Sequence, residues 1–581
     1  MMDDIVGIDL GTTNSEIALY RDGRPEILAD EQGRKILPSV VGVTEVGELL
    51  VGEEARNQLL LYPDRTVRSI KRRMGQAETV RMAGHDYTPQ EISAIILKRL
   101  KEIGERRLGR PVLKAVITVP AYFSDTQRQA TREAGEIAGL EVVRIINEPT
   151  AAALVYEAGQ HQGKRILVYD LGGGTFDVSV VRIEEGVVEV ISSHGNNHLG
   201  GDDFDQKIVA HVLDHLRLKQ GVDVSDQPRA MARILRAAEA AKKHLSDHPY
   251  ARIEEEYLTE VGSKPVHLSL ELARDEYEQM ITPFVEETLQ AIHSALQAAD
   301  LTASQVDEIL LVGGATRTPM IRRRLLEVFD REPRGEVDAD LCVALGAAIQ
   351  GAAIGGAEVS AVLVDVTPYT FGTSALGELS GELYPYLYVP IIARNTPIPV
   401  RKSEAFYTVM NDQTEVDVRI YQGESEDALE NIKIGQFMIE GLSKAPAGNP
   451  VVLDLALDRD GILHVTATEK DTGLERRISI DQAVARYSAA ELRRARDRIG
   501  TLFGQDDTDP PLGEDVVGSG HTAVAALLAK ASARLDTIGE EDRLEMIDLM
   551  EMIRDAEAAG DTAALDQART QLGDLLFYLD T

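Results

Sequence analysis

Two segments of the chain repeat one pattern, and this repeat constrains the fold more than any other feature. Residues 5–20 read IVGIDLGTTNSEIALY, and residues 166–183 read ILVYDLGGGTFDVSVVRI. Each is an apolar strand ending in Asp-Leu-Gly, then a glycine- or threonine-bearing turn and a second alternating strand. The pattern predicts two β-hairpins of one design. Strands and helical stretches interleave up to about residue 355, which predicts an α/β domain with parallel segments.

The glycine turns predict a phosphate site. Their backbone N–H groups are not screened by side chains, so they can hold phosphate oxygens. A third such turn, ILLVGGATRTPMI, occupies residues 309–321. Asp9 and Asp170 end the first strand of each repeat, and two carboxylates across a cleft suit a hydrated Mg²⁺ on a polyphosphate. One turn alone would be an ordinary hairpin, but three together favour nucleotide binding.

The pattern of the sequence changes along the chain. At 581 residues the chain is too long for one core, so several domains are expected. We predict a nucleotide-binding α/β domain over residues 1–357 and a short apolar linker over 358–365. Alternating strands and turn signals predict an all-β sandwich over 366–487. Residues 488–581 are predicted to be a helical tail, interrupted by a polar, proline-bearing loop at 504–520.

Composition limits the partners and the compartment. The chain carries 61 Lys and Arg against 96 Asp and Glu, a formal net charge of −35. Such a surface repels nucleic acid and anionic lipid, so neither nucleic acid nor a membrane is expected as a partner. The single cysteine, Cys342, excludes an internal disulfide and suits a reducing compartment. The acidic N-terminus is not typical of a signal peptide, so we expect a cytoplasmic protein.

Several motifs, in order, resemble one family. They are IDLGTTNS (8–15), NEPTAAAL (147–154), DLGGGTFDVSV (170–180), HLGGDDFD (198–205) and VGGATRTP (312–319), followed by RNTPIP (394–399), YQGE (421–424), IGQF (434–437) and DGILHVTATEK (460–470). Together they resemble the seventy-kilodalton heat-shock chaperones, most closely the bacterial DnaK type. The resemblance implies an actin-like, duplicated ribonuclease H-like ATPase domain, a β-sandwich that binds peptide and a helical lid, here in a compact member with a shortened lid.

The resemblance also implies site residues and cofactors. The cofactors would be ATP or ADP with Mg²⁺, and K⁺ is left open. Lys71 would reach the γ-phosphate, and Asp177 would orient the attacking water. The other catalytic positions would be Asp9, Glu148, Asp170 and Thr175, with Asp9, Glu148 and Asp170 holding the metal through water. The remaining ATP contacts would be Gly11, Thr12, Thr13, Gly172, Gly173, Gly174, Gly200, Gly201, Glu239, Lys242, Lys243, Ser246, Gly313, Gly314, Arg317 and Asp340.

Peptide and partner sites follow from the same resemblance. The peptide-binding residues would be Leu376, Phe406, Val409, Val416 and Val418. Leu363 and Asp365 of the linker would switch between docked and released states, and Arg144, Asn147 and Asp365 would engage a J-domain co-chaperone. Partners would include unfolded client polypeptides and a GrpE-like exchange factor, and the protein would be mainly monomeric. A departure from the family is a longer loop bearing Tyr384, Tyr386 and Tyr388, which predicts a more aromatic rim.

Two other function classes use a similar fold, and fold alone does not choose among them. A sugar kinase has no need of a β-sandwich with a peptide groove, and a filament-forming ATPase would lack residues 366–581. A nucleotide-gated binding protein without turnover is a third class. The presence of Lys71, Thr175 and Asp177 argues against that class.

Overall fold

The computed structural model describes residues 4–157, 163–184, 186–261, 264–334, 338–357, 359, 362–470, 472–479 and 487–504, with the isolated residues Met546, Leu549, Met550, Ile553 and Leu572. The chain forms two compact units, residues 1–508 and 509–581. Every helix and strand named below belongs to the first unit.

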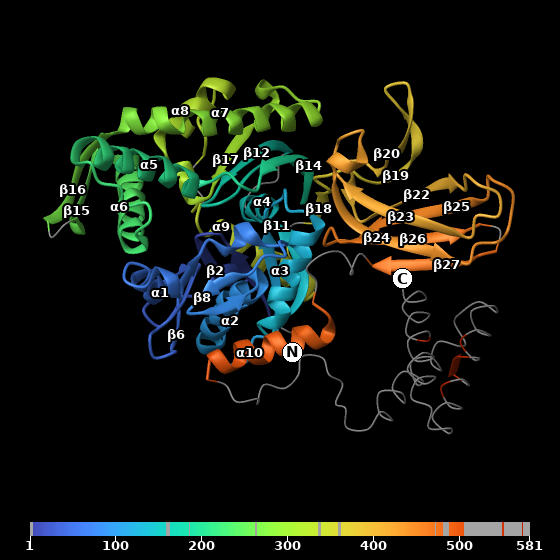
Figure 1. Cartoon of the computed structure of the whole chain (residues 1–581), viewed down its shortest axis with the longest axis horizontal. Helices are drawn as coiled ribbons and strands as arrows, with labels where there is room; N and C mark the ends of the chain where they lie inside the picture. Colours follow the sequence, from blue (N-terminus) through green and yellow to red (C-terminus); the bar gives the residue numbers. More distant parts are fainter. Residues whose placement is uncertain are drawn as a thin grey trace. The chain divides into compact units, whose positions relative to one another are not determined.

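The first lobe is built on a mixed sheet in the order β11-β10-β1-β2-β3, with β4 paired to β2 (Figure 1). Its strands are β1 (Ile5–Leu10), β2 (Asn14–Arg21), β3 (Arg24–Ile27), β4 (Leu37–Pro38), β10 (Lys114–Val119) and β11 (Glu141–Asn147). β1 is antiparallel to β2 and parallel to β10. The lobe also carries the small sheet β5 (Val40–Val43), β6 (Leu49–Val51) and β7 (Thr66–Arg68), and the ribbon β8 (Val80–Met82) and β9 (His85–Tyr87).

The second lobe repeats this arrangement. Its sheet has the order β17-β12-β13-β14-β18-β21. The strands are β12 (Lys164–Leu171), β13 (Phe176–Glu184), β14 (Val187–Asn196), β17 (Glu308–Val312), β18 (Val362–Val366) and β21 (Pro397–Ile398), and a separate hairpin joins β15 (Tyr250–Val261) to β16 (Lys264–Ala273). β12 is antiparallel to β13 and parallel to β17. Both predicted hairpins and their duplication are therefore confirmed.

Helices cover the sheets, and their starts follow local capping signals. They are α1 (Glu53–Gln58), α2 (Pro89–Leu108), α3 (Asp125–Ile137), α4 (Glu148–Glu157), α5 (Gly201–Gln220), α6 (Pro228–Asp247), α7 (Arg274–Ala298), α8 (Pro319–Phe329), α9 (Cys342–Ile354) and α10 (Ala489–Leu502). Thr88, Ser124 and Ser488 form capping boxes at the starts of α2, α3 and α10. Each of these boxes pairs backbone N–H groups that the first turn of a helix leaves without partners.

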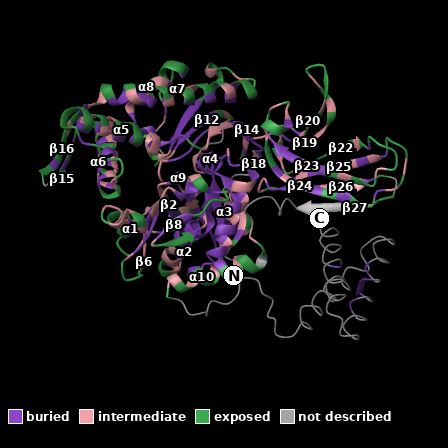
Figure 2. Ribbon diagram, viewed as in Figure 1, coloured by how far each residue is buried: buried purple, intermediate pink, exposed green. Residues whose placement is uncertain are grey.

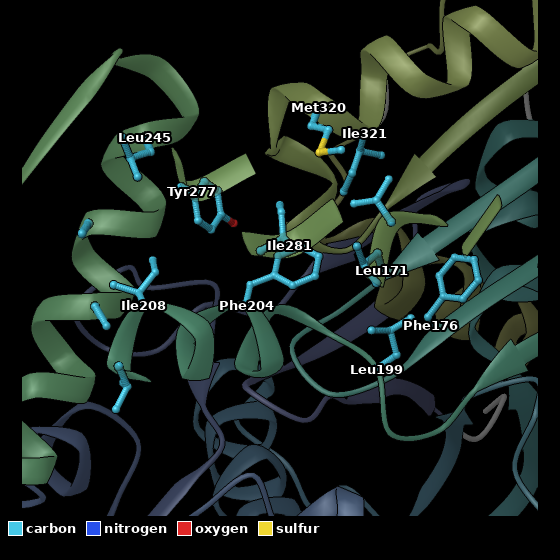
Figure 3. Packing of buried hydrophobic residues seen from close by; sticks show 14 of the residues in the cluster. Leu171, Phe176, Leu199, Phe204, Ile208, Leu245, Tyr277, Ile281, Met320 and Ile321 are labelled. Carbon is cyan, nitrogen blue, oxygen red and sulfur yellow. The ribbon is translucent and has the colours of Figure 1, made fainter. Parts of the chain in front are cut away.

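Apolar packing holds each lobe and joins the two. In the second lobe, the β12–β13 hairpin packs through Leu171 and Phe176 against helical residues such as Phe204 and Ile281 (Figures 2 and 3). A further cluster combines β1, β10, β12 and β13 with α4 and α9. α4 and α9 approach closely, since a Cβ at Gly346 would lie 1.8 Å from the carbonyl oxygen of Ala151. This contact sets the spacing of the two lobes around the cleft.

The third part is a sandwich of two four-stranded sheets, β20-β19-β23-β24 and β22-β25-β26-β27. Its strands are β19 (Phe371–Leu379), β20 (Glu382–Ile392), β22 (Val400–Tyr407), β23 (Glu415–Gln422), β24 (Ile432–Glu440), β25 (Pro450–Leu457), β26 (Leu463–Glu469) and β27 (Glu475–Ser479). The inward-facing residues of both sheets, among them Ile420, Leu455 and Val465, form one core. The all-β prediction is confirmed.

The predicted linker is a strand of the second lobe. In β18, Val362, Leu363 and Val364 pair in parallel with β14, and Asp365 and Val366 pair with β21. The apolar strip is thus bound to the sheet of the second lobe by a backbone ladder. It extends one residue beyond the predicted end at 365.

The tail is described only at its start. Ala495 and Ile499 of α10 join the core of the first lobe, and the hydroxyls of Tyr487 and Thr88 lie 2.6 Å apart. The predicted loop at 504–520 lies, apart from Gly504, outside the described residues. Within the described ranges, no helix is both long enough and apolar enough to cross a membrane. Cys342 is buried, and burial raises the pKa of its thiol.

A buried carboxylate, Glu469, ties the end of β26 to its neighbours. It accepts hydrogen bonds from the backbone N–H and hydroxyl of Ser443 at 2.9 and 2.5 Å, from Asn449 Nδ2 at 2.5 Å and from the Thr472 hydroxyl. Burial alone raises the pKa of Glu469, but these hydrogen bonds outweigh burial and lower the pKa to about 2.

We therefore expect Glu469→Gln to destabilise the sandwich by about 2 kcal/mol at pH 7. Hydrogen exchange of β25 and β26 in the full chain measures this. Because the folded-state pKa is depressed, the stabilisation is complete above the ordinary value of 4.5 and is lost as pH falls toward 2. The difference between wild type and variant should shrink over that range. Glu404→Gln, at an exposed position of β22, should change little, and equal effects of the two variants would contradict the assignment.

Candidate functional site

Two adjoining cavities lie between the lobes. The smaller, about 80 Å³, contains Asp9, Lys71, Glu148, Asp170 and Thr175 in its wall. The larger, about 750 Å³, opens beside it. Both walls include Thr13, Asn14, Gly172, Gly173, Gly314, Ala339 and Asp340. Residues of the three glycine turns predicted to meet phosphate therefore line the smaller cavity together, and some of them also line the larger one.

A buried ion pair lies at the centre of the smaller cavity. Lys71, in the short 3-10 helix η2 (Ile70–Arg73), is 3% exposed, and its ammonium group donates to Glu148 Oε1 at the start of α4. The Lys71 ammonium also lies 5.7 Å from the ring centroid of Phe123. Local sequence gives no reason to bury a lysine in the basic run 68–73. The tertiary structure does so by placing carboxylates around it.

Burial and mutual repulsion raise the pKa values of several carboxyl groups in the cleft. Burial, together with the nearby Glu148 carboxylate, raises the pKa of Asp9 to about 7 and the pKa of Asp177 to about 7. The same two causes raise the pKa of Asp170 well above its usual range. Several buried carboxyl groups facing one ammonium group therefore need further positive charge before they can all ionise.

Neighbouring groups orient two of these carboxylates. The Thr118 hydroxyl of β10 donates to Asp9 Oδ1 at 2.8 Å. The backbone N–H of Tyr122 donates to Asp177 Oδ1 at 3.0 Å. Asp177 itself lies next to the cavity wall rather than in it, since the residues lining the cavity do not include it. The sequence analysis missed Thr118 and Tyr122 because neither lies in a glycine turn.

The turns leave donors free for a ligand. In the described part of the chain, the buried hydroxyls of Thr12 and Thr13 make no hydrogen bond to protein. A Cβ at Gly173 would lie 1.8 Å from Thr13 Oγ1, so no side chain can fill the space between the two turns. The adjoining predicted residues Gly11, Gly172, Gly313 and Gly314 also line the cavity. Gly174 packs against Thr12 and Gly200 packs against Gly173, and neither is among the residues that line the two cavities. These features fit a polyphosphate.

The larger cavity has the size and lining for the nucleoside. Its wall includes the predicted residues Gly201, Glu239, Lys242, Lys243, Ser246, Gly314, Arg317 and Asp340. Lys242 donates to Asp205 Oδ2 and to the carbonyl of Gly201, both at 2.9 Å, and Lys243 donates to Glu239 at 2.6 Å. Arg317 pairs with Asp340. All four adenosine-side residues of α6 thus face one cavity.

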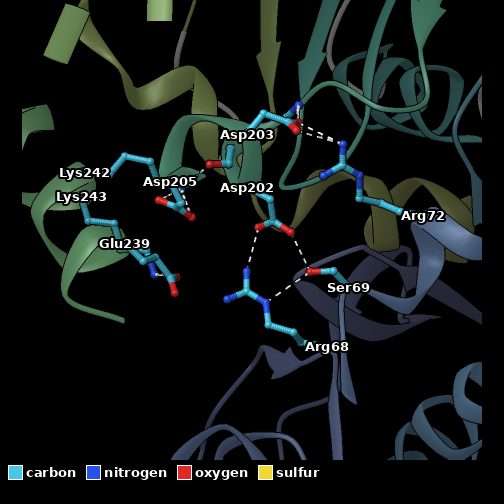
Figure 4. A network of polar contacts seen from close by, with 11 residues as sticks. Arg68, Ser69, Arg72, Asp202, Asp203, Asp205, Glu239, Lys242 and Lys243 are labelled. Carbon is cyan, nitrogen blue, oxygen red and sulfur yellow. Dashed lines mark hydrogen bonds and ion pairs between the residues drawn. The ribbon is translucent and has the colours of Figure 1, made fainter. Parts of the chain in front are cut away.

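A second set of contacts, not predicted from sequence, bridges the lobes at the mouth of the cleft (Figure 4). Arg68 and Ser69 donate to Asp202 at 3.0 and 2.6 Å. Arg72 donates to Asp203 at 3.1 Å, and also to the carbonyl of His198. The predicted motif HLGGDDFD contains both aspartates, but sequence alone cannot show that the basic run 68–73 lies opposite them.

Metal ligation through water fits the donor set. In the residues that the structure describes, no group of three or more His, Cys, Asp or Glu side chains could hold a metal directly. Asp9, Glu148 and Asp170 nevertheless face one small cavity. Mg²⁺ keeps several waters and takes few protein ligands, so carboxylates at this spacing suit a hydrated ion bound to phosphate.

The predicted peptide-binding residues fall into two groups. Leu376 and Val409 are 48% and 59% exposed. Val418 is buried in the sandwich core, and Phe406 and Val416 pack against that core. Leu376 and Val409 are therefore the two that are largely exposed, whereas Phe406 and Val416 are half-buried. The other three remain predictions, and their packing gives them a structural role.

The three tyrosines of the long β19–β20 hairpin are engaged within the domain. Tyr384 donates to Asp427 at 3.0 Å, and Tyr388 donates to the carbonyl of Thr370 at 2.9 Å. Tyr386 lies under Arg419, at 5.5 Å. These contacts brace the hairpin, so the tyrosines support its position. The exposed Leu383 and Leu376 are the apolar groups that the hairpin presents.

The linker and the sandwich contact the first lobe through two aspartates. Asp365 accepts from Asn147 Nδ2 at 2.8 Å and from the Thr150 hydroxyl at 3.2 Å. Asp460 pairs with Arg132 and, at 3.2 Å, with Arg144. The structure thus brings together Arg144, Asn147 and Asp365, and it adds Asp460, which the sequence analysis placed in a motif without a role.

The fold and cleft define a class: a two-lobed nucleotide-binding domain whose second sheet is extended by the linker to a β-sandwich. Comparisons with known proteins specify it further. The family model described as Hsp70 protein matches residues 5–80 and 76–574. The chain is 49% identical over 481 residues to the chaperone protein DnaK of Thermotoga neapolitana and to that of Thermotoga maritima, covering 81% of this chain and 79% of each relative. It is 48% identical over 479 residues to that of Thermosipho africanus, with the same shares covered.

The chain belongs to the Hsp70 family. It is an ATP-dependent molecular chaperone of the DnaK-like type, with ATPase activity. Neither a sugar kinase nor a filament-forming ATPase agrees with these findings.

The position of Lys71 generates a prediction. Lys71→Ala should bind nucleotide within a few-fold of wild type, because the glycine turns and α6 remain. Hydrolysis should fall by about 10²–10³ in a single-turnover assay, since one charge-neutralising group is lost. Lys35→Ala, an exposed lysine of the same lobe, is the matched control. A near-normal rate in Lys71→Ala would show that Lys71 has no part in the chemistry.

Proposed function

We propose that this chaperone binds ATP with Mg²⁺ in the interlobe cavity of an actin-like, duplicated domain. The observation that carries the proposal is a pair of adjoining cavities with a shared wall: the glycine turns and the buried Lys71–Glu148 pair line the smaller, and α6 lines the larger. Backbone N–H groups of the turns and the free Thr12 and Thr13 hydroxyls would hold the phosphates. The α6 residues and Arg317 would hold the nucleoside.

In this proposal the residues act mainly by positioning and charge. Asp9, Glu148 and Asp170 hold waters around the metal, which supplies charge neutralisation on the phosphate oxygens. Lys71 neutralises charge near the γ-phosphate, and Thr175 donates to the same group. Asp177, held by the Tyr122 N–H, orients the attacking water or accepts its proton. A K⁺ ion nearby would add to the same electrostatic effect.

We further propose that the sandwich binds extended apolar segments of unfolded polypeptides. Supporting this are exposed apolar residues at two places in the sandwich. Leu376 and Leu383 lie in strands β19 and β20, and Tyr407 ends β22, with Val409 and Met410 just after it. Exposed large apolar side chains that form a patch are typical of interaction surfaces. Main-chain hydrogen bonds to an extended segment would add affinity.

Coupling between the nucleotide cavity and the peptide-binding surface of the sandwich would involve the linker strand β18. β18 is part of the ATPase sheet, and Asp365 is bound to Asn147 and Thr150. Tyr369, just after the linker, donates to the carbonyl of Tyr122 at 2.8 Å, and its ring lies 4.5 Å from the Tyr122 ring. The backbone N–H of Tyr122 in turn donates to Asp177. Tyr122 therefore links Tyr369, which follows the linker, to the proposed catalytic carboxylate.

The proposed partners are client polypeptides, a J-domain co-chaperone and a GrpE-like exchange factor, and the proposed setting is the cytoplasm. Arg144, Asn147 and Asp365, the predicted J-domain contacts, all lie at the junction between the first lobe and the sandwich. A partner at this junction could favour one docking state over another. We propose that the protein acts mainly as a monomer.

Stimulation of ATP turnover by an apolar peptide tests the proposed function. Wild type should be stimulated, whereas Asp365→Ala and Leu363→Asp should keep nearly normal basal turnover and lose stimulation, because the docked strand is weakened. Asp226→Ala, an exposed aspartate of the second lobe, should behave as wild type. Stimulation that survives both linker variants would show that the linker is only a tether.

Peptide affinity tests whether Leu376 and Val409 belong to the proposed peptide-binding surface of the sandwich. Leu376→Asp and Val409→Asp should each weaken binding of an extended apolar peptide by about tenfold or more, because burying one such side chain is worth about 1.5–3 kcal/mol. Leu429→Asp introduces the same change at a position 56% exposed elsewhere on the sandwich and should have little effect. Fluorescence anisotropy measures all three. Equal losses of peptide affinity in all three variants would show that Leu376 and Val409 are not specific parts of the peptide-binding surface.

A further inference from the structure

Each of the two duplicated hairpins has a pair of carboxylates, and the two pairs occupy equivalent positions. In the second hairpin, Asp170 of β12 lies directly opposite Asp177 of β13. In the first hairpin, Asp9 of β1 lies directly opposite Glu16 of β2. The separation along the chain is seven residues in both, from 9 to 16 and from 170 to 177. Glu16 is therefore the first-lobe counterpart of Asp177, although it lies outside the motifs that identified the site.

Glu16 faces the phosphate cavity. Residues opposite one another in an antiparallel pair project to the same face of the sheet, so Glu16 and Asp9 share a face. Both line the smaller cavity with Lys71, Glu148 and Asp170. Glu16 is 2% exposed. Across the described ranges, its carboxylate makes no hydrogen bond or ion pair of its own.

The surroundings of Glu16 are mainly acidic. The charged groups that act on it are Asp9, Asp340, Glu148 and Lys71, and the Lys71 ammonium is already paired with Glu148. Two carboxyl groups directly opposite each other are unfavourable in a sheet, and burial adds to the cost. Nothing in the packing of β2 requires a carboxylate there. The buried Thr12 hydroxyl, also without a partner, lines the same cavity.

We propose that Glu16 is a further residue of the nucleotide site, which accepts hydrogen bonds from the waters of the hydrated divalent cation that accompanies the nucleotide. The inference rests on the proposed nucleotide function of the cavity. Asp9, Glu16, Glu148, Asp170 and Asp340 all line that cavity, and they can all ionise only when a divalent cation accompanies the polyphosphate. Glu16 thereby makes nucleotide affinity depend on Mg²⁺ and acts as a positioning residue rather than a catalytic one.

The test is the dissociation constant of fluorescently labelled ADP. It is measured on the full chain with excess Mg²⁺ and again with EDTA. In wild type, removal of Mg²⁺ should weaken binding strongly. The ratio of the dissociation constant in EDTA to that in Mg²⁺ should be smaller in Glu16→Gln than in wild type by about tenfold or more, since one charge close to the phosphates is gone. Glu16→Asp keeps the charge and should keep most of the ratio. Glu26→Gln, an exposed glutamate on β3 of the same sheet, should leave it unchanged.

Thermal unfolding gives a second measurement. Removing one of two opposed carboxyl groups should raise the melting temperature of nucleotide-free Glu16→Gln, so loss of folding is not expected. An unchanged Mg²⁺ ratio in Glu16→Gln overturns the proposal, as does restoration of wild-type affinity by K⁺ alone in EDTA, which would indicate a monovalent site. If wild type binds no ADP with Mg²⁺, the proposed nucleotide function fails instead, so the two failures are distinguishable.

Discussion

The cleft depends on one buried ammonium group among carboxylates. Lys71 pairs with Glu148 while Asp9 and Asp170 face the same small cavity. In a low-dielectric site one positive charge cannot balance several negative ones, and the raised pKa values of Asp9 and Asp177 record this shortage. The site is therefore built to be completed by a cation bound to an anion. Nucleotide with its metal supplies both.

The same constraint explains why the lobes must be joined as they are. The carboxylates come from both hairpins, Lys71 comes from η2, and Glu148 begins α4. They meet only because α4 and α9 pack between the two sheets with no space for larger side chains. At the mouth of the cleft, Arg68 and Arg72 pair with Asp202 and Asp203 across the lobes. Any change in the angle between the lobes would alter these pairs and the cavity together.

The docked linker extends this dependence to the sandwich. A strand of five residues adds to the second sheet, and Asp365 and Asp460 bind the first lobe. Backbone pairing with β14 and the hydrogen bonds of Asp365 to Asn147 and Thr150 hold the strand in this docked position. An arrangement of that kind can have two states of similar free energy, which is what coupling between distant sites requires.

Sequence reasoning recovered the elements whose signals are local. The duplicated hairpins and the strands of the sandwich each follow from a short run of residues, because turn chemistry and alternation act over a few positions. The same holds for the glycine turns that predicted a phosphate site. Contacts between distant segments were recovered less well. Asp460 was seen only as part of a motif, and the tyrosines of the β19–β20 hairpin were expected at a peptide rim but brace the hairpin instead.

What the sequence by itself determined is therefore the family, the order of the domains and the residue types that chemistry requires in each turn. Only the tertiary structure decided which of those residues share a cavity. Lys71 is one member of a basic run until folding surrounds it with carboxylates, and Glu16 is one residue of an alternating strand until the hairpin register sets it opposite Asp9. The physical reason is that burial and charge interaction depend on distance in space, and the packing of the lobes, rather than separation along the chain, sets that distance.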